Sequence, residues 1–190
     1  KTSAENILTA VWCGHLSYRK APALLLEALA AGESTRQKVF IKIIGSGPLE
    51  RDMHNLADEL GLCNIDWIKS VKHEEVFEIM RNSDFLIHTS LREATSSVIP
   101  EALSVGLPVI CHDANGMKLA VTDDCGIKVP LLSPRDSVIG FHEAIKRLID
   151  DRTHLLNLKN GAKNRAAELT WDKMAQDIAD DYWISRNQST

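Results

Sequence analysis

The stretch DFLIHTSLREATSSVIPEALSVGLPVICH, residues 84–112, contains two strand signals with a helix signal between them. The runs 84–90 and 108–112 have apolar centres, at 85–87 and 109–111, which is typical of strands covered on both faces. The intervening run 97–106 has a helical start, with Pro100 in the first turn, where its missing N–H costs nothing. Strands joined by a helix lie parallel, so this stretch predicts a βαβ unit.

The same alternation of short β-branched runs and amphipathic segments continues in both directions along the chain. It predicts an α/β fold with a Rossmann-like, doubly wound parallel sheet of about six strands. The further predicted strands are 7–12, 39–44, 64–68 and 126–130, and the further predicted helices are 20–32, 48–61 and 73–82.

The last third of the chain is predicted to be helical. Helical periodicity covers the segments 134–150, 152–169 and 171–186. Ser133-Pro134 and Thr170 are start signals for the first and last of them. We expect these helices to pack on the sheet edge or to bridge to a neighbouring domain. No repeat, low-complexity segment or Gly/Ser linker is found, so we expect residues 1–190 to form a single domain.

Composition excludes several classes of protein. The 190 residues are 44% hydrophobic, enough for a sizeable core, and their net charge of −4 is spread without a basic stripe. A nucleic-acid groove would need such a stripe, so no nucleic-acid partner is predicted. The sequence starts on Lys1 and enters a strand almost at once, so we expect it to be part of a longer protein whose other functions are missing here.

The cysteines and the N-terminus indicate the compartment. Cys13, Cys63, Cys111 and Cys125 are widely spaced and form no CxxC pair, so we interpret them as small core side chains in a reducing environment. Neither a leader-like segment nor an apolar stretch long enough to span a bilayer is present. These features predict a cytoplasmic chain.

Glu93 and Glu101 are the most informative candidate site residues. In open parallel sheets, ligands bind beyond the carboxyl ends of the strands, and a helix that begins there offers free N–H groups to a phosphate. Carboxylates beside an anion site would not bind the anion itself, so we interpret them as acceptors of hydrogen bonds from hydroxyls attached to it. This suggests a sugar nucleotide. Two alternatives stay open: Glu101 also suits the helix dipole, and Glu93 with Thr95 and Ser96 could form a capped surface loop.

Two glycine turns follow the first and second predicted strands. Gly14 precedes Arg19 and Lys20, where a lysine at a helix start could neutralise a diphosphate, although a solvated basic turn is an equal alternative. Residues 45–48, GSGP, favour a tight strand-to-helix turn with Pro48 at the first helical position. This is no GxGxxG motif, because Glu50 stands where the third glycine would be.

Other catalytic motifs are absent from the sequence. The seven histidines form no HxxxH or HExxH pair and have no cysteine nearby to complete a zinc site. There is no DxD, no GxSxG and no Walker lysine motif. The sequence therefore predicts neither a metal site nor a covalent nucleophile.

Taken together and in order, these motifs resemble the C-terminal domain of retaining GT-B glycosyltransferases of group 1, family 4. The resemblance covers nearly the whole chain, including the closing helix with its Thr170-Trp171 start. It implies one half of a GT-B fold that binds a nucleotide sugar, while a preceding half, absent here, binds the acceptor. The motifs that carry it are GHLSYRK, GSGP, DFLIHTS, REATSSVIPEAL, SVGLPVI, NGMKLAV and GIKVP.

The resemblance assigns roles residue by residue. It implies that Lys20 holds the donor diphosphate, that Glu93 lies near the hexose and that Glu101 binds the ribose hydroxyls. From its place after the third predicted strand, we expect the loop 69–72 to bind the base. The predicted catalytic residues are Glu93 and Lys20, and the predicted donor-binding residues are Gly14, His15, Arg19, Lys20, Gly45, Gly47, Pro48, Ser70, Val71, Thr95, Ser96, Ser97, Val98 and Glu101.

The sequence departs from the family pattern at three places. His15 replaces the usual arginine and cannot form a guanidinium fork, so diphosphate binding would be weaker or would depend on Arg19. Ala21 replaces a usual glycine, which we interpret as a minor change. Residues 94–96, Ala-Thr-Ser, replace the common Gly-aromatic-Gly and leave the identity of the donor sugar open.

The predicted function is a donor-binding domain of a retaining hexosyltransferase that uses a nucleoside diphosphate sugar, with no cofactor and no metal, and a glycan or lipid-linked acceptor. We expect this chain alone to bind nucleotide but to transfer little. The alternatives are a nucleotide-sugar epimerase of GT-B plan and a non-catalytic nucleotide-sugar-binding domain. For the full-length protein, peripheral association with the inner membrane face stays open.

Overall fold

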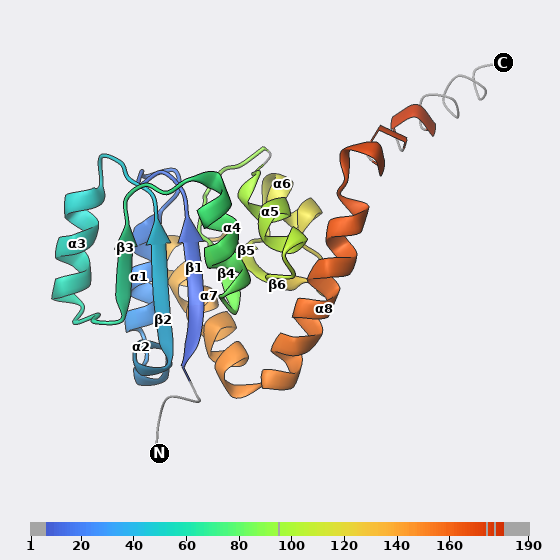
Figure 1. Cartoon of the computed structure of the whole chain (residues 1–190). Helices are drawn as coiled ribbons and strands as arrows, with labels where there is room; N and C mark the ends of the chain where they lie inside the picture. Colours follow the sequence, from blue (N-terminus) through green and yellow to red (C-terminus); the bar gives the residue numbers. More distant parts are fainter. Residues whose placement is uncertain (1–6, 95, 174, 177, 181–190) are drawn as a thin grey trace.

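The computed structural model describes residues 7–94, 96–173, 175–176 and 178–180 (Figure 1). Its centre is a parallel sheet of six strands in the order β3-β2-β1-β4-β5-β6. The order reverses between β1 and β4, and sheets of this type bind ligands beyond the carboxyl ends of the strands at such a point. The strands are β1 (Leu8–Cys13), β2 (Val39–Ile44), β3 (Ile65–Ile68), β4 (Phe85–His88), β5 (Val109–His112) and β6 (Gly126–Val129).

Eight helices accompany the sheet in the described part of the chain. The predicted α/β fold with a doubly wound parallel sheet is confirmed, with the predicted strands at their predicted places. The helices are α1 (Pro22–Ala30), α2 (Glu33–Lys38), α3 (Glu50–Glu59), α4 (His73–Arg81), α5 (Val98–Ser104), α6 (Asn115–Ala120), α7 (Pro134–Asp150) and α8 (Arg152–Glu168).

Each face of the sheet has its own hydrophobic core, because side chains alternate along a strand. On β1, Trp12 belongs to the core beneath α1, α3 and α7, whereas Val11 belongs to the core beneath α4, α5 and α6. Helix α8 contributes to both cores, since Leu155 and Leu158 lie in the first and Ala162 in the second. The helix therefore passes from one face of the sheet to the other.

Helix α7 lies on a face of the sheet and contacts α1, β5 and β6, rather than packing on the sheet edge as predicted. Its start was predicted correctly: Pro134 is the first helical residue, and the Ser133 hydroxyl accepts a hydrogen bond from Asp136 N at 3.1 Å. The predicted helix 171–186 lies partly outside the described residues. Positions 171–173, 175–176 and 178–180 are helical.

Two short helices were not predicted. The predicted helix 20–32 ends at Ala30, and α2 follows at once in a stretch too polar to show periodicity. The hydroxyl of Thr35 is buried there and donates to Leu29 O at 2.8 Å, which fixes the turn between the two helices. Helix α6 was missed because it has only six residues and begins at Asn115 in the left-handed conformation, with φ 52°.

Two local predictions need correction. Pro48 lies in a turn before α3, which begins at Glu50, so it is not the first helical residue. Cys63 is exposed rather than a core side chain, unlike Cys111 and Cys125. Among the described residues, no helix is both long and apolar enough to cross a membrane.

Candidate functional site

The turns after β1 and β2 pack directly against each other. Gly14 N donates to Ile44 O at 3.0 Å, so the pairing of the two strands continues into the turns. Gly45 has φ 140°, and a Cβ there would lie 1.9 Å from Gly14 O. A Cβ at Gly47 would lie 2.4 Å from Leu16 O. Packing between the two loops therefore requires glycine at positions 45 and 47. This agrees with the tight strand-to-helix turn that is predicted for residues 45–48.

Gly14 itself is under no such constraint. A Cβ there would meet Trp12 Cη2 at 3.4 Å and Lys20 Cδ at 3.6 Å, which are ordinary contacts. Its φ lies outside the left-handed region. Neither packing nor backbone geometry explains glycine at this position, so its role in admitting a ligand stays a prediction.

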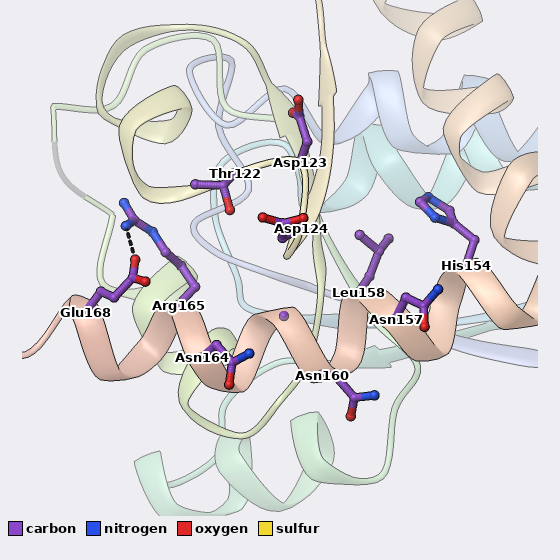
Figure 2. A pocket seen from close by; sticks show the side chains of 11 residues that line it. Thr122, Asp123, Asp124, His154, Asn157, Leu158, Asn160, Asn164, Arg165 and Glu168 are labelled. Carbon is purple, nitrogen blue, oxygen red and sulfur yellow. Dashed lines mark hydrogen bonds and ion pairs between the residues drawn. The ribbon is translucent and has the colours of Figure 1, made fainter.

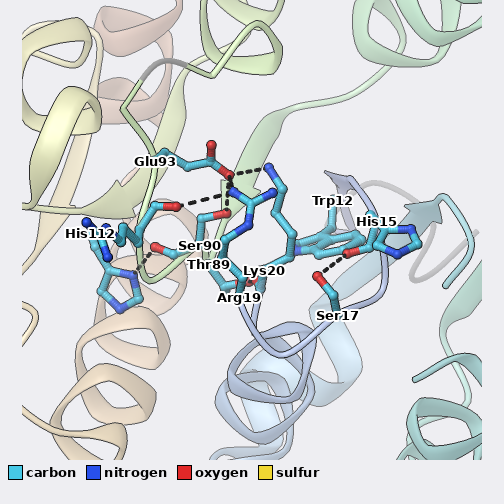
Figure 3. A network of polar contacts seen from close by, with 10 residues as sticks. Trp12, His15, Ser17, Arg19, Lys20, Thr89, Ser90, Glu93 and His112 are labelled. Atoms are coloured by element: carbon cyan, nitrogen blue, oxygen red, sulfur yellow. Dashed lines mark hydrogen bonds and ion pairs between the residues drawn. The ribbon is translucent and has the colours of Figure 1, made fainter. Parts of the chain in front are cut away.

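Lys20 and Arg19 both bind Glu93, between the loops after β1 and β4 (Figure 3). The Arg19 guanidinium donates to Glu93 Oε1 at 2.8 Å, and the Lys20 ammonium is paired with the same oxygen. Ser90 Oγ donates to it as well, at 3.0 Å. No described residue hydrogen-bonds to Glu93 Oε2. One carboxylate oxygen is thus saturated, and the other keeps its acceptor capacity.

The environment keeps Glu93 ionised at neutral pH. Its burial, with 8% of its surface exposed, opposes ionisation. Hydrogen bonds from Lys20 and Ser90 and the charges of Lys20 and Arg19 outweigh that effect, so the pKa of the carboxyl lies below its ordinary value. Glu93 can therefore accept a hydrogen bond or stabilise positive charge, but it is not a proton donor near pH 7.

Thr89 connects the turn that carries Arg19 and Lys20 to the loop after β4. Its hydroxyl accepts from Trp12 Nε1 at 2.9 Å and donates to Lys20 O at 2.8 Å. Leu91 N donates to Arg19 O at 3.0 Å. Sequence reasoning missed Thr89 and Trp12, because a threonine at a strand end and a core tryptophan carry no signal of their pairing across the fold.

Ala21 is strained by its place in this turn. It adopts φ 46° and ψ 52°, the left-handed conformation, directly before α1. A residue with a Cβ pays about 1–2 kcal/mol there, which glycine does not. The replacement of glycine by Ala21 is therefore not the minor change that we predicted.

Two buried histidines lie beneath the loop after β4. His112 contacts Ser90 O through Nδ1 and Ser137 Oγ through Nε2, both at 3.0 Å. Burial lowers the pKa of His112, although the hydrogen bond with Ser90 raises it. Burial lowers the pKa of His88 to about 4, helped by the charge of Lys20. His88 Nε2 has no hydrogen-bond partner among the described residues.

Glu101 lies in the first turn of α5, as predicted. It is close enough to the end of β1 that its charge adds to the effect of burial in raising the pKa of Cys13 to about 11. Ser97 occupies the N-cap position of α5, but its side chain makes no capping hydrogen bond. Glu101 is thus near the Gly14 turn, on a helix that its neighbours Ala102 and Leu103 anchor in the core.

The loop after β4 is also fastened by the start of α6. Gly116 N donates to Glu93 O at 3.1 Å, and a Cβ at Gly116 would lie 2.0 Å from Ala94 O. Any side chain at position 116 would displace residues 93–94. The glycine of the NGMKLAV motif therefore serves the site by close packing.

The remaining predicted residues are more loosely connected. His15 is exposed, and its carbonyl accepts from Ser17 Oγ at 3.3 Å. Ser70 and Val71 follow β3, whose Ile68 O accepts from Gly45 N at 2.8 Å, so their loop borders the 45–48 turn. Ser96 and Val98 are half-buried beside Ser97, and Thr95 lies outside the described residues.

A separate pocket of about 810 Å³ lies between α8 and the turn 122–124 (Figure 2). Its lining is polar and includes Asp123, His154 and Arg165, and it contains none of the predicted site residues. Within the described ranges, no group of three or more His, Cys, Asp or Glu side chains is placed to hold a metal ion.

Solved structures share this fold. The chain superposes on the pneumococcal O-GlcNAc transferase GtfA, solved with UDP and GlcNAc, with a TM-score of 0.80 at 15% identity over 93% of this chain and 35% of that one. The structure of HepE from Anabaena with UDP-glucose gives a TM-score of 0.77 at 21% identity over 93% of this chain and 49% of that one. These identities establish the fold alone.

The chain is also similar in sequence to glycosyltransferases that are longer than it. A D-inositol 3-phosphate glycosyltransferase of Streptomyces bingchenggensis is 30% identical over 188 residues, which cover 93% of this chain and 40% of that protein. The gpi3 subunit of the Schizosaccharomyces pombe phosphatidylinositol N-acetylglucosaminyltransferase is 30% identical over 116 residues, 60% of this chain and 25% of that one. The chain thus spans about 40% of the length of the first of these relatives.

The family model described as glycosyl transferases group 1 matches residues 2–165. The chain therefore belongs to the group 1 glycosyl transferases, and it corresponds to their C-terminal domain.

Proposed function

We propose that this domain binds a nucleoside diphosphate sugar and presents it for hexosyl transfer. The observation that carries the proposal is the cluster of Lys20, Arg19 and Glu93 at the point where the strand order reverses. Two cations suit a diphosphate, and a carboxylate with one unoccupied oxygen suits a sugar hydroxyl. A ligand that carries a diphosphate next to a sugar would therefore fit the cluster better than a ligand with only one of the two.

Lys20 and Arg19 would act on the leaving diphosphate. Only 13% of the Lys20 side chain is exposed, so its charge acts with little screening by solvent, whereas 55% of the Arg19 side chain is exposed. Negative charge develops on the diphosphate as the glycosidic bond breaks, and fixed cations stabilise it there. Lys20 is the stronger candidate for this role because Thr89 holds its backbone and Glu93 its ammonium group.

Glu93 would orient the hexose through Oε2. Its Oε1 is held by donors from two loops, so the carboxylate cannot rotate freely. A fixed carboxylate interacts more favourably with the sugar as positive charge develops on the sugar in the transition state. This difference lowers the barrier to transfer. Glu101, near the Gly14 turn, would accept hydrogen bonds from the ribose hydroxyls.

The acceptor would be bound outside this chain. Because the chain spans about 40% of the relative from Streptomyces bingchenggensis, we propose that the remaining part of the protein supplies the acceptor site. The names of the relatives, an inositol phosphate and a phosphatidylinositol glycosyltransferase, favour a phosphorylated or lipid-linked polyol over a protein. Retention of configuration and inactivity of this chain alone remain part of the proposal.

Calorimetric titration of the chain with UDP-, GDP- and ADP-sugars tests the proposal. We expect binding of one base class and a loss of affinity of about tenfold or more in Lys20→Met, because a charged hydrogen bond is lost. Lys146→Met is the matched control, since Lys146 pairs with Asp150 on the exposed side of α7. If no nucleotide sugar binds, the donor-domain proposal fails.

The full-length protein separates the alternatives. Turnover of the free nucleotide sugar without acceptor would indicate an epimerase, and binding without any turnover would indicate a non-catalytic domain. Transfer that requires an acceptor supports the proposed function.

A further inference from the structure

A buried chain of hydrogen bonds connects α7 with Glu93. Ser137 Oγ lies 3.0 Å from His112 Nε2, His112 Nδ1 lies 3.0 Å from Ser90 O, and Ser90 Oγ lies 3.0 Å from Glu93 Oε1. Ser90, His112 and Ser137 are fully buried. The chain of hydrogen bonds thus joins three elements: α7, the end of β5 and the loop after β4. Figure 3 shows its part from His112 through Ser90 to Glu93.

The direction of each hydrogen bond follows from its partners. Ser90 O is a carbonyl and accepts only, so His112 Nδ1 carries the hydrogen. Burial keeps the imidazole neutral, and its Nε2 is then an acceptor for the Ser137 hydroxyl. Ionised Glu93 also accepts only, so Ser90 Oγ donates to it. Only one tautomer of neutral His112 satisfies both of its contacts.

Helix α7 holds the imidazole from two sides. Phe141 lies one turn after Ser137 on the same face of the helix and meets the His112 ring edge to face, with centroids 4.9 Å apart and an angle of 80°. Phe141 is fully buried. The ring is therefore fixed by packing as well as by hydrogen bonds, which makes it a rigid support.

The loop after β4 needs such a support. Strand β4 ends at His88, and residues 89–94 have no regular secondary structure. Several of its hydrogen bonds run to Arg19 and Lys20, which belong to the same site. Others run to the rest of the fold: Trp12 Nε1 donates to Thr89, and Gly116 N donates to Glu93 O. His112 is the residue that connects the loop, through Ser90 O, with α7.

We propose that His112 and Ser137 are positioning residues, which hold Ser90 and, through its hydroxyl, keep Glu93 Oε2 directed at the donor sugar. This inference rests on the proposed function, because it assigns Glu93 to the sugar. Neither residue touches the ligand. His112→Phe keeps the ring volume against Phe141 but removes both hydrogen bonds, whereas His112→Asn keeps a donor close to the place of Nδ1.

The test compares His112→Phe, His112→Asn and Ser137→Ala with the unsubstituted chain in three measurements. These are the titration of the Glu93 carboxyl by carbon NMR, the calorimetric affinities for UDP and UDP-glucose, and the melting temperature. We expect His112→Phe to weaken UDP-glucose binding by about tenfold, UDP binding less, and to raise the pKa of Glu93. His112→Asn would keep most of the UDP-glucose affinity and most of the lowering of the Glu93 pKa. Ser137→Ala would weaken UDP-glucose binding by about twofold to fivefold.

A lower melting temperature with unchanged Glu93 titration and unchanged UDP-glucose affinity would overturn the proposal, since the pair would then be merely structural. Should His112→Phe fail to fold, Ser137→Ala still decides, because it removes only the Ser137 end of the chain of hydrogen bonds. If the unsubstituted chain binds no nucleotide sugar, the proposed function fails, whereas the Glu93 titration still reports whether His112 positions Ser90.

Discussion

Lys20 and Glu93 form an ion pair between the loops after β1 and β4, the two neighbouring strands at which the order of the sheet reverses. The residues are far apart in sequence and come from loops that Thr89 fastens together. In the proposed function, a diphosphate would bind the ammonium group that Glu93 Oε1 contacts in this structure. The proposed ligand and this ion pair would therefore compete for Lys20.

That competition predicts opposite effects of Glu93→Gln on two ligands. The substitution keeps the shape of the side chain but frees Lys20 and Arg19, so we expect UDP to bind as tightly as before or more tightly. The additional affinity of UDP-glucose over UDP would fall, because the amide accepts a sugar hydroxyl less strongly than a carboxylate. In the full-length protein we expect the transfer rate to fall by about 100-fold. Equal weakening of UDP and UDP-glucose would contradict the role assigned to Glu93.

Glu101→Gln tests the ribose role. Hydrogen bonds from ribose hydroxyls to a carboxylate contribute about 1.5–3 kcal/mol, so we expect UDP affinity to fall by about tenfold or more. The control is a ligand rather than a variant: 2′,3′-dideoxy-UDP lacks both hydroxyls, and its affinity would be the same for Glu101→Gln as for the original chain. An equal loss for both nucleotides would show that Glu101 acts on α5 and not on the ribose.

His88→Leu is expected to stabilise the fold in acid. The pKa of His88 is about 4 in the folded state against 6.5 ordinarily, so the unfolded chain binds more protons between these values and stability falls as the pH drops. Between pH 7 and pH 5 the free energy of unfolding falls by about 2 kcal/mol through this effect. His88→Leu would abolish this part of the loss. Glu93, whose pKa is lowered, adds a loss at still lower pH in both proteins.

Urea unfolding at pH 7 and pH 5 measures this difference. His112→Leu serves as the matched comparison, since it removes two satisfied hydrogen bonds and is expected to destabilise at both pH values. An identical loss of stability between pH 7 and pH 5 in the original chain and in His88→Leu would refute the assignment to His88.

Gly45→Ala and Gly14→Ala separate folding from ligand access. Position 45 has φ 140° and a Cβ there would lie 1.9 Å from Gly14 O, so we expect Gly45→Ala to destabilise the domain by about 2 kcal/mol or more. Gly14→Ala meets only ordinary contacts and is expected to leave the melting temperature within a few degrees. If the Gly14 turn admits the diphosphate, Gly14→Ala would nevertheless weaken UDP binding. Unchanged affinity would leave Gly14 without a role in the site.

The sequence predicted the sheet because strands covered on both faces have an apolar centre, as residues 85–87 do within 84–90. It also placed Glu93, Lys20 and Glu101 at strand ends, which parallel strands bring to one edge. The pairing of Lys20 with Glu93 and the support from Thr89 could not be predicted. Such contacts depend on the register and twist of strands that are distant in sequence, and no local pattern records them.

Polar residues in buried places were missed for a related reason. His112 is the last residue of β5 and Ser137 lies in the first turn of α7, and each has an ordinary role in isolation. Their partnership arises only when α7 packs on β5. The strain at Ala21 was likewise hidden, because a residue name does not reveal its φ angle.

The passage of α8 from one hydrophobic core to the other bears on how the domain unfolds. Leu155 and Leu158 support the first core, Ala162 supports the second, and Lys159 between them pairs with Asp84 at 2.8 Å, at the start of β4. Neither layer of helices can detach without disturbing a helix that the other layer also needs. Amide protons on both sides of the sheet are thus expected to exchange through one common cooperative opening, rather than through two independent ones.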